Sequence, residues 1–492
     1  MKTSNSNPTH YWKPAQLADP NLYTGDLETQ FSVPTPDLPQ ASSSSVSFSP
    51  DGSPVLFQPD YPDVDDLQIR LSEIEAILGS DQDFEESFDV CSSWATDDPN
   101  PHPHPDNDEY GLMNDIIARG DLKQGLLLCA KAVADNNTAT AELLISMLRP
   151  LVSVSGEPVQ RLGAYMLEGL VARLSSSGSF IYKALKCKEP TSNQLLSYML
   201  LLYEACPYFK FGYLSANGAI AEAMKTEDRI HIIDFQIAQG GQWVTLIQAL
   251  AGRPGGPPRL RITGIDDSRN AFARGGGLNI VGGRLGKLAE TCKVPFEFHP
   301  VLVSGSGIEI EHLQVRPGEA LAVNCAFVLH HMPDESVDPQ NHRDRLLRLI
   351  KSLSPKVVTL VEQEANVNTA KFFHRFQETF SYYSAMFDSI DATLARDNKE
   401  RINVEQHCLA GEIVNILACE GVEREERHEV LAKWKSRFAM AGFSPYPLSG
   451  YVNATIKTLL ENYCDKYRLQ ERDGALFLGW MNRDLVSSCA WR

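Results

Sequence analysis

The stretch RIHIIDFQIAQGGQW, residues 229–243, combines an apolar run, an acid and a glycine pair. The apolar run, which only His231 interrupts, ends at Asp234, and Gly240 and Gly241 follow. Many nucleotide-binding α/β domains begin with a buried strand that ends in an acid and leads into a glycine turn. Asp234 and the two glycines are therefore the first candidates for a ligand-binding groove.

Polar side chains also follow the other predicted strands of this region. Ligands of α/β sheets bind where the carboxyl ends of parallel strands meet. Asp266 stands where Rossmann-type domains place an acid for a ribose, and FVLHHM resembles a segment of many methyltransferases. The candidate groove residues are Asp234, Gly240, Gly241, Asp266, Asn324, His330 and Glu362, with Asp267, His331 and Glu364 beside them.

The loop after Asp234 argues against a bound cofactor. A loop that cradles a cofactor usually has a glycine within two residues of the acid, so that the backbone can approach closely. Here residues 235–239, FQIAQ, come before the first glycine. We therefore predict no cofactor and a structural or weakly ligand-facing Asp234. We also expect Ile230, Ile232 and Ile233 to be buried and His231 to have a hydrogen-bond partner.

No catalytic or metal-binding set is recognisable in the sequence. Two adjacent histidines at a strand end are weak evidence for catalysis, and no nucleophile, base and orienting residue can be identified. The ten cysteines form no CxxC pair and no Cys/His cluster at metal-ligand spacing. We predict that the protein is not an enzyme and binds no metal.

The elements that would position these residues alternate between strand and helix from residue 229 onward. Strands are predicted at RIHIIDF, RLRITGIDDS, FEFHPVLV, ALAVNCAFVLHHM and KVVTLVEQE, with helices between them. This alternation predicts a doubly wound parallel sheet of the Rossmann-like, methyltransferase-like kind. The end of the chain indicates a helix followed by a pair of strands.

Residues 111–228 carry a helical pattern instead. Leu122, Leu126 and Val133 recur on one helical face, and further helical segments follow up to residue 224. We expect an all-helical cap in which these residues and Leu144 and Leu148 are buried. The leucine-rich face could also serve association with a partner, although its segments are too short for a sustained coiled coil.

Residues 1–110 are predicted to be a disordered acidic tail. They hold 21 acidic and three basic residues, which accounts for the whole net charge of −18. Their Pro, Ser and Asp content leaves little apolar surface to bury. One helical island, residues 65–78, carries Leu67, Leu71 and Ile74 between acids, and Phe84 and Phe88 follow it. The island is either a transient helix without a role or a helix that binds a partner's groove.

The expected compartment is the cytosol or the nucleus. We expect no signal peptide, because a polar stretch follows Met1, and no membrane segment, because no apolar run approaches the roughly 20 residues that one needs. The scattered cysteines are expected to be reduced thiols. The acidic tail repels nucleic acid, and the charge-balanced remainder offers no general attraction for it. Direct DNA binding would need a basic patch that only the folded chain could form.

Several motifs match one family. IHIIDF resembles the VHIID motif of the GRAS family of plant transcriptional regulators. The leucine-rich block from Leu122 to about Tyr203, and GLNIVGGRLGKLAETC, are similar to its two leucine heptad regions. The region from Pro355 to RINVEQHC resembles its PFYRE region, and the tryptophan-containing end of the chain resembles its SAW region. The resemblance covers residues 111–492 in the family's motif order.

The resemblance implies a regulator that acts in the nucleus, with the cytoplasm as a second location. It would work through other transcription factors or GRAS proteins, in a homodimer or heterodimer. GLLLCAKAV and IVNILACEGVEREERHE are similar to the Scarecrow-like branch, which is tied to phytochrome A signalling. The DELLA motif of the gibberellin-sensing branch is absent, and Cys489 replaces the serine of the terminal Ser-Ala-Trp motif. The alternative function is a small-molecule-binding or methyltransferase-like enzyme that uses the groove at the sheet edge.

Overall fold

The computed structural model describes residues 111, 116, 119–175, 192–267 and 277–492, and the following account concerns these residues. The acidic tail, with Leu67, Leu71 and Ile74, lies outside the described residues.

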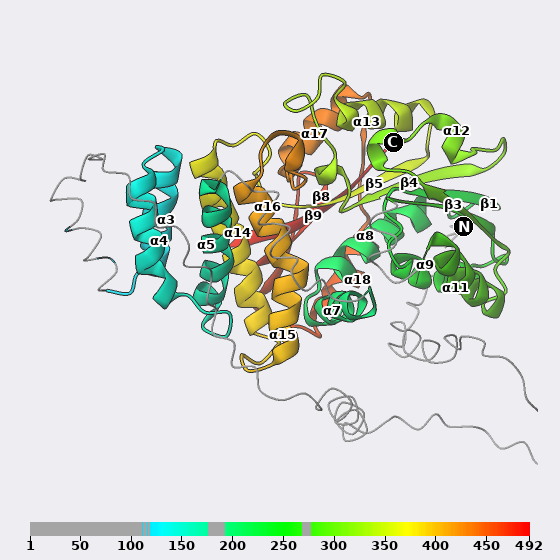
Figure 1. Ribbon diagram of the computed structural model, residues 1–492. Helices are drawn as coiled ribbons and strands as arrows, with labels where there is room; N and C mark the ends of the chain where they lie inside the picture. Colours follow the sequence, from blue (N-terminus) through cyan, green and yellow to red (C-terminus); the bar gives the residue numbers. More distant parts are fainter. Residues whose placement is uncertain (1–110, 112–115, 117–118, 176–191, 268–276) are drawn as a thin grey trace, which may run out of the picture. The chain divides into compact units, whose positions relative to one another are not determined.

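One sheet of nine strands forms the centre of the described chain (Figure 1). Its order is β3-β2-β1-β4-β5-β9-β8-β7, and β6 pairs with β9. The first five strands in this order are parallel, whereas β9, β8 and β7 run antiparallel to their neighbours. The strands are β1 Arg229–Asp234, β2 Arg259–Asp266, β3 Phe296–Leu302, β4 Ala320–Ala326, β5 Val357–Gln363, β6 Pro445–Tyr446, β7 Tyr467–Arg472, β8 Ala475–Trp480 and β9 Arg483–Trp491.

Both faces of β1, β2, β4 and β5 are buried, whereas the edge strand β3 is mostly half-buried or exposed. Successive side chains of a strand point to opposite faces, so Ile230 and Ile232 pack on one face and Ile233 on the other. His231 is fully buried, and its ring nitrogens contact the Thr263 hydroxyl at 2.8 Å and the Arg261 guanidinium at 2.9 Å. The burial of the three isoleucines and the hydrogen-bonded His231 agree with the prediction.

Helices cover each face of this sheet. The face of Ile232 packs against α8, α9 and α11, and the face of Ile233 packs against α13 and α17. Helix α18 contacts α8 and β7. Their bounds are α8 Tyr208–Ala223, α9 Gly241–Ala251, α11 Leu278–Thr291, α13 His342–Ser352, α17 Leu431–Met440 and α18 Gly450–Leu460; the four-residue helix α12, Ile310–Leu313, precedes β4.

A helical bundle built from two separate parts of the chain lies beside the sheet (Figure 1). Helix α5 contacts α3, α14 and α16, so helices that come before β1 pack against helices that follow β5. Helix α7 contacts α8 and α15. The bounds are α3 Leu122–Ala134, α4 Thr138–Leu148, α5 Pro158–Leu174, α7 Ser192–Ala205, α14 Phe372–Asp391, α15 Lys399–Val404 and α16 Ala410–Ala418, with a π-helical turn at Glu405–Leu409.

Two local predictions were wrong. The chain ends in three strands instead of a pair. Strand β7 was not predicted because its sequence, YRLQER, is mostly exposed and has no apolar period. The strand predicted to extend into the histidine pair stops at Ala326, since Phe327 has a left-handed φ of 55°. His330 and His331 therefore lie in a 3-10 turn, Leu329–His331.

Candidate functional site

The carboxylate of Asp234, at the end of β1, is buried among hydrogen-bond donors. Trp243 Nε1 donates to Asp234 Oδ2 at 2.8 Å. Asn324 Nδ2 and the backbone N–H of Gln236 donate to Asp234 Oδ1 at 3.0 and 3.2 Å. Burial raises the pKa of Asp234 to about 6, and the hydrogen bonds from Asn324 and Trp243 oppose this rise. The carboxylate thus holds β1, β4 and α9 together.

Asn324 extends this network to the helices on one face of the sheet. It exchanges hydrogen bonds with the side-chain amide of Gln242 at 3.0 and 3.3 Å, and Thr359 Oγ1 donates to Asn324 Oδ1 at 2.8 Å. Gln242 Nε2 also donates to Asn217 Oδ1 of α8 at 3.2 Å. Sequence reasoning identified Asp234 and Asn324 but missed Gln242, Thr359 and Asn217, because internal partners of a buried acid have no fixed spacing.

Apolar side chains fill the space beside Asp234 where a cofactor would approach. Phe235 and Ile237 are each 3% exposed, and the Ile237 N–H donates to the Ile265 carbonyl of β2 at 3.1 Å. A Cβ added to Gly264, the partner of Asp234 in β2, would lie 3.0 Å from Ile237 and 2.7 Å from Phe298. The geometry does not fit a nucleotide-like cofactor on Asp234.

The two glycines of the loop serve the backbone and the packing of helices. Gly240 has a φ of 75°, a left-handed conformation that favours glycine, and a Cβ there would lie 2.9 Å from Val281 of α11. Gly241 is the first residue of α9. The left-handed backbone and the close approach to α11 therefore account for Gly240.

The remaining acids at the strand ends also have structural contacts. Asp266, at the end of β2, is 5% exposed and accepts a hydrogen bond from the Asp267 N–H at 2.9 Å. Both carboxylate oxygens of Glu364 accept from the Leu431 N–H, at 3.1 Å each, and so cap the start of α17.

His330 and Glu362 form a second buried pair at the ends of β4 and β5. Glu362 Oε2 lies 2.6 Å from His330 Nδ1, and Glu362 Oε1 accepts from the Leu329 N–H at 2.8 Å. Burial raises the pKa of Glu362 to about 7 and lowers the pKa of His330 well below its usual value. Burial therefore favours the uncharged form of each group.

Three further titratable residues surround this pair, and sequence reasoning missed all of them. The His428 ring lies 4.2 Å from the His330 ring, and His428 Nε2 is 3.2 Å from Glu426 Oε2. Burial raises the pKa of Glu412 to about 7, and its carboxylate accepts from Tyr383 Oη at 2.7 Å. Glu426 and His428 belong to IVNILACEGVEREERHE and Glu412 directly precedes it, and only folding brings these residues together.

The histidine–glutamate cluster contains the described residues best suited to hold a metal ion. Ligand atoms of His330, Glu362 and His428 lie within 4.8 Å of one another, as do those of His330, His331 and Glu426. A tetrahedral site with ligands near 2.1 Å would separate its donor atoms by about 3.4 Å. The 2.6 Å contact between His330 and Glu362 is shorter than this and is a hydrogen bond. The cluster is a buried proton-sharing network in this arrangement.

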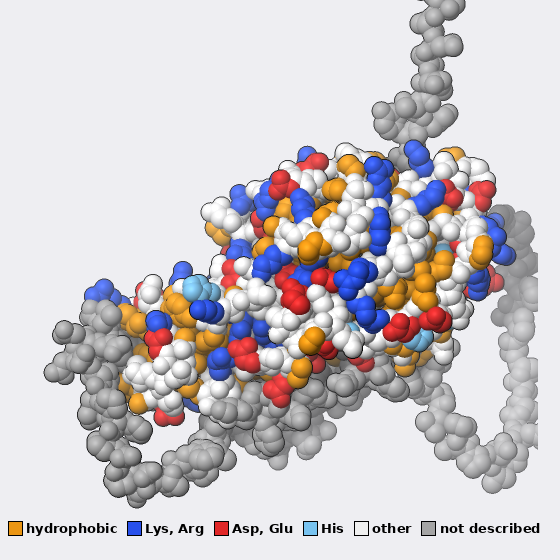
Figure 2. All heavy atoms as spheres, turned by 90° about the horizontal axis from the view of Figure 1, so that it is seen from above, with side chains coloured by type: hydrophobic (Ala, Val, Ile, Leu, Met, Phe, Trp, Pro, Cys, Tyr) orange, Lys and Arg blue, Asp and Glu red, His pale blue; other side chains and the backbone are white. Residues whose placement is uncertain are grey.

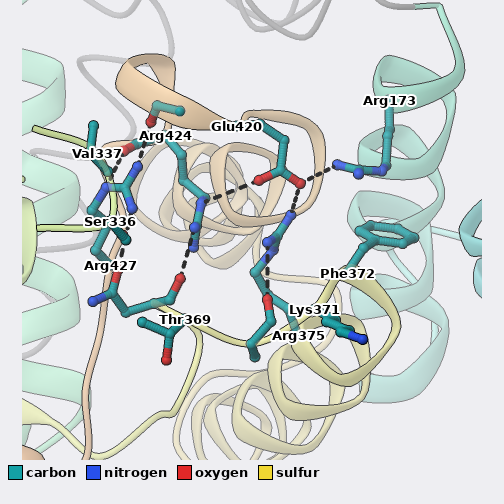
Figure 3. A pocket seen from close by; sticks show the side chains of 13 residues that line it. Arg173, Ser336, Val337, Thr369, Lys371, Phe372, Arg375, Glu420, Arg424 and Arg427 are labelled. Atoms are coloured by element: carbon teal, nitrogen blue, oxygen red, sulfur yellow. Dashed lines mark hydrogen bonds and ion pairs between the residues drawn. The ribbon is translucent and has the colours of Figure 1, made fainter.

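A basic pocket that sequence reasoning did not locate opens between α5, α14 and the segment after α16 (Figure 3). Its cavity has a volume of about 430 Å³. We call it the arginine pocket and define it by six of its charged lining residues: Arg173, Lys371, Arg375, Glu420, Arg424 and Arg427. Because these residues are scattered over more than 250 positions of the sequence, only folding brings them together.

The leucines proposed for partner binding lie in the core of the helical bundle. Leu122, Leu126 and Val133 are 5%, 0% and 7% exposed, and Leu144 and Leu148 are also buried. All five belong to one hydrophobic cluster with residues of α5 and α14. Their side chains thus stabilise the bundle.

Two features bear on the cellular compartment. No described helix has the length and apolar character needed to cross a membrane. The eight cysteines within the described residues are free thiols.

Comparison with known proteins agrees with this fold. A family model described as the GRAS domain family matches residues 122–492. The chain is 71% identical over 377 residues to the Scarecrow-like transcription factor PAT1 of Arabidopsis thaliana, covering 76% of this chain and 77% of that protein. It is 58% identical over 487 residues to the chitin-inducible gibberellin-responsive protein 2 of Oryza sativa subsp. japonica, covering 96% and 88%. The crystal structure of SCL7 in Oryza sativa has 37% sequence identity and a TM-score of 0.66, covering 75% of this chain and 99% of that one.

Proposed function

Because the chain belongs to the GRAS domain family, we propose that it is a plant transcriptional regulator that works in the nucleus through protein partners. The relative named Scarecrow-like transcription factor PAT1 shares 71% of its residues over the aligned region, which supports this role. Phytochrome A signalling is the pathway that we propose for it. Other transcription factors or GRAS proteins are the proposed partners, in homodimers or heterodimers.

One structural observation carries the proposal that the sheet edge is not catalytic. The Asp234 carboxylate accepts from Trp243, Asn324 and Gln236, all inside the protein. Phe235 and Ile237 fill the adjacent space. A scaffold of this kind offers its surface to partners, because the candidate groove beside Asp234 is filled by the protein's own side chains.

A reporter assay tests the regulatory role. The full chain is fused to a heterologous DNA-binding domain in plant protoplasts, and reporter transcription is compared with that of the DNA-binding domain alone. We expect a change in transcription that the variant Leu126→Asp loses, because a carboxylate at a fully buried position disrupts the helical bundle. Equal transcription from the fusion and the DNA-binding domain alone would contradict the proposal.

The methyltransferase-like alternative has its own test. Isothermal titration of the full chain with S-adenosylmethionine should give no binding heat. Micromolar binding that disappears in Asp234→Ala and Asp266→Ala would establish the enzyme-like alternative instead.

A protein-interaction assay addresses the proposed division of the chain. We propose that residues 1–110 and residues 111–492 bind different partners, and affinity purification with each segment as a separate bait should recover different sets of transcription factors. Identical sets from both baits would refute this division.

A further inference from the structure

The arginine pocket holds more positive charge than its own carboxylate can neutralise. Arg173 comes from α5, Lys371 and Arg375 from the start of α14, and Arg424 and Arg427 from the segment after α16. Glu420 is the one acidic residue among those that line the cavity. Five basic side chains thus face one carboxylate.

Glu420 is shared among three guanidinium groups (Figure 3). Its Oε1 accepts from Arg173 Nη1 at 2.8 Å and from Arg375 Nη2, and its Oε2 lies 3.9 Å from Arg424 Nε. Burial acts to raise the pKa of Glu420, but the hydrogen bonds from Arg375 and Arg173 outweigh it, and the pKa is lowered. Glu420 is therefore ionised, and its two carboxylate oxygens already contact three arginines.

Arg424 and Arg427 are oriented by neutral groups. Arg424 donates to the carbonyl oxygens of Val367 and Asn368 at 2.7 and 2.8 Å, and Arg427 donates to the Arg424 carbonyl at 2.9 Å. Carbonyl oxygens fix a guanidinium in place without cancelling its charge.

Arg424 shows the effect of this uncompensated charge. Its pKa is lowered to about 9, first by burial and then by the nearby Arg375 and Arg427. Arg424 is 6% exposed and Arg375 is 2% exposed, and neither Nε has a hydrogen-bond partner. A bound anion would relieve the repulsion among these cations.

The nearest buried acids are committed to other arginines. Asp334 lies 3.2 Å from Arg437, and Glu429 lies 2.8 Å from Arg437 and 3.1 Å from Arg343. Asp334 also attracts Arg424 and Arg427 from a distance, but neither acid lines the cavity, whose lining keeps five basic residues and one acidic residue.

The N-terminus of α14 adds a further attraction for anions. This helix has 20 residues, and Thr369, Ala370, Lys371 and Phe372 at its start all line the cavity. The N-cap Lys371 makes no side-chain capping bond, and the first turn holds no acidic residue. A helix N-terminus carries partial positive charge and N–H groups that suit a phosphate.

The geometry points to the arginine pocket as the binding site for a phosphate monoester carried on a serine or threonine of a partner protein. A phosphoryl group carries nearly two negative charges and three acceptor oxygens, which match several guanidinium groups and a helix N-terminus. The volume of about 430 Å³ falls within the roughly 300–1,000 Å³ of ordinary ligand sites. This inference rests on the proposed function, since it assigns the chemistry of one partner.

Duplex DNA fits the pocket less well. DNA binding uses many phosphates in a row, whereas this cavity concentrates its cations around one point. Lys and Arg side chains are intermixed with Asp and Glu side chains on the face drawn in Figure 2. One phosphoryl group inserted from a peptide is the better match.

Lys371→Glu is the most informative variant. Lys371 is exposed, so its substitution spares the buried network while reversing one charge at the pocket. Lys399→Glu is the matched control, because Lys399 is also exposed at the start of a helix, α15, and lies outside the pocket lining. Arg173→Gln removes a second pocket cation whose side chain is 24% exposed.

The test measures fluorescence anisotropy of a short labelled peptide with one phosphoserine among alanines, mixed with the full chain. We expect binding that is about tenfold tighter than that of the unphosphorylated peptide. Inorganic phosphate should compete better than chloride at equal ionic strength. Lys371→Glu and Arg173→Gln should each lower the affinity for the phosphopeptide by about tenfold. Lys399→Glu should leave this affinity unchanged.

Three results would overturn the inference. The first is equal binding of the two peptides together with no competition by phosphate. The second is that inorganic phosphate binds but the phosphopeptide does not, which would make the pocket a site for a free ion. The third is a phosphopeptide complex that survives Lys371→Glu or is displaced by duplex DNA more readily than by phosphate. None of these results affects the reporter assay, so failure of this inference and failure of the proposed function can be told apart.

Discussion

A buried acid at a strand end serves either a ligand or the protein itself, and its neighbours decide which. For Asp234 the sequence predicted a structural or weakly ligand-facing role, because five residues separate this acid from the first glycine. The structure supplies the partners, Trp243 and Asn324, which lie nine and 90 positions away. Partners at such separations could not be inferred from local spacing. The same limit hid Glu412, Glu426 and His428, since only folding brings them to His330.

Replacement of Asp234 tests its structural role. Asp234→Asn should lower the free energy of unfolding by about 1–3 kcal/mol, because an amide N–H₂ would face groups that are themselves donors. The measurement is urea denaturation followed by circular dichroism. The control is Asp228→Asn, whose side chain is 96% exposed just before β1. Equal stability of Asp234→Asn and the native chain would contradict the role assigned to this carboxylate.

The pKa of Glu362 predicts how stability depends on pH. Its pKa rises from 4.5 to about 7 on burial, so the unfolded chain loses this proton at a lower pH than the folded chain. The contribution of Glu362 to the free energy of unfolding is therefore fully present below about pH 4.5. It falls by roughly 3 kcal/mol as the pH rises to about 7.

The variant Glu362→Gln separates this contribution from that of the neighbouring histidines. The pKa values of His330 and His428 are lowered by burial, so their contributions rise with pH up to about 6.5 and act in the opposite direction. Relative to Glu362→Gln, the native chain should lose stability between pH 4.5 and pH 7 in guanidinium denaturation series. Parallel pH profiles of the two proteins would refute the assignment.

Among the secondary-structure elements, the helical bundle depends on a buried ion network that joins distant helices. Arg161 of α5 is fully buried and donates to both oxygens of Glu405, at 3.0 and 3.1 Å, and to Asp391 at 2.8 Å. Arg401 donates to the same Glu405 at 2.7 Å. Glu405 begins the π-helical turn between α15 and α16, so one carboxylate holds the irregular junction against α5.

Loss of this carboxylate should be costly. Glu405→Ala leaves Arg161 and Arg401 without their shared counter-ion, and we expect a loss of about 3–5 kcal/mol in the free energy of unfolding. Glu400→Ala, on the exposed side of α15, should change it by less than about 0.5 kcal/mol. Thermal and urea denaturation measure both. A similar small effect for the two variants would show that the network does not stabilise the bundle.

Apolar periodicity determined which elements could be predicted. The parallel strands β1, β2, β4 and β5 were recognisable because both of their faces are buried and their sequences are largely apolar. Strand β7 was missed because its side chains are mostly exposed, and the turn at Phe327 was missed because its positive φ leaves no mark in residue type. Contact between helices before β1 and after β5 depends on tertiary packing alone.

For the whole molecule, net charge and charge placement give different information. Residues 1–110 account for all of the −18, and the remainder is balanced by count. Within this balanced remainder, the arginine pocket brings together five basic residues that do not form a continuous basic run in the sequence. Composition therefore predicted the absence of a general attraction to polyanions, whereas a local anion site required the fold.

The activating role of the acidic tail is a prediction that a fusion of residues 1–110 to a DNA-binding domain can test. We predict that residues 1–110 fused to a neutral DNA-binding domain activate a reporter through residues 65–90, the acidic–apolar segment. Replacement of its five apolar residues by alanine should remove the activation; they are Leu67, Leu71, Ile74, Phe84 and Phe88. Alanine at Leu17, Leu22, Leu27, Leu38 and Val46 is the matched control and should leave activation intact. An intact tail without activity would rule out this role.

The insertion of β9 between β5 and β8 has a consequence for how the chain is made on the ribosome. Strand β5 ends at Gln363 and its partner begins at Arg483, 120 positions later by the difference of the two numbers. At roughly 5–20 residues per second, translation of that interval takes roughly 6–24 s. Throughout it, β5 presents an unpaired apolar edge, the kind of surface that chaperones protect and that aggregates when left alone. A chain truncated within this interval would lack β9, the strand that joins β5 to β8, and would keep β5 as an open edge.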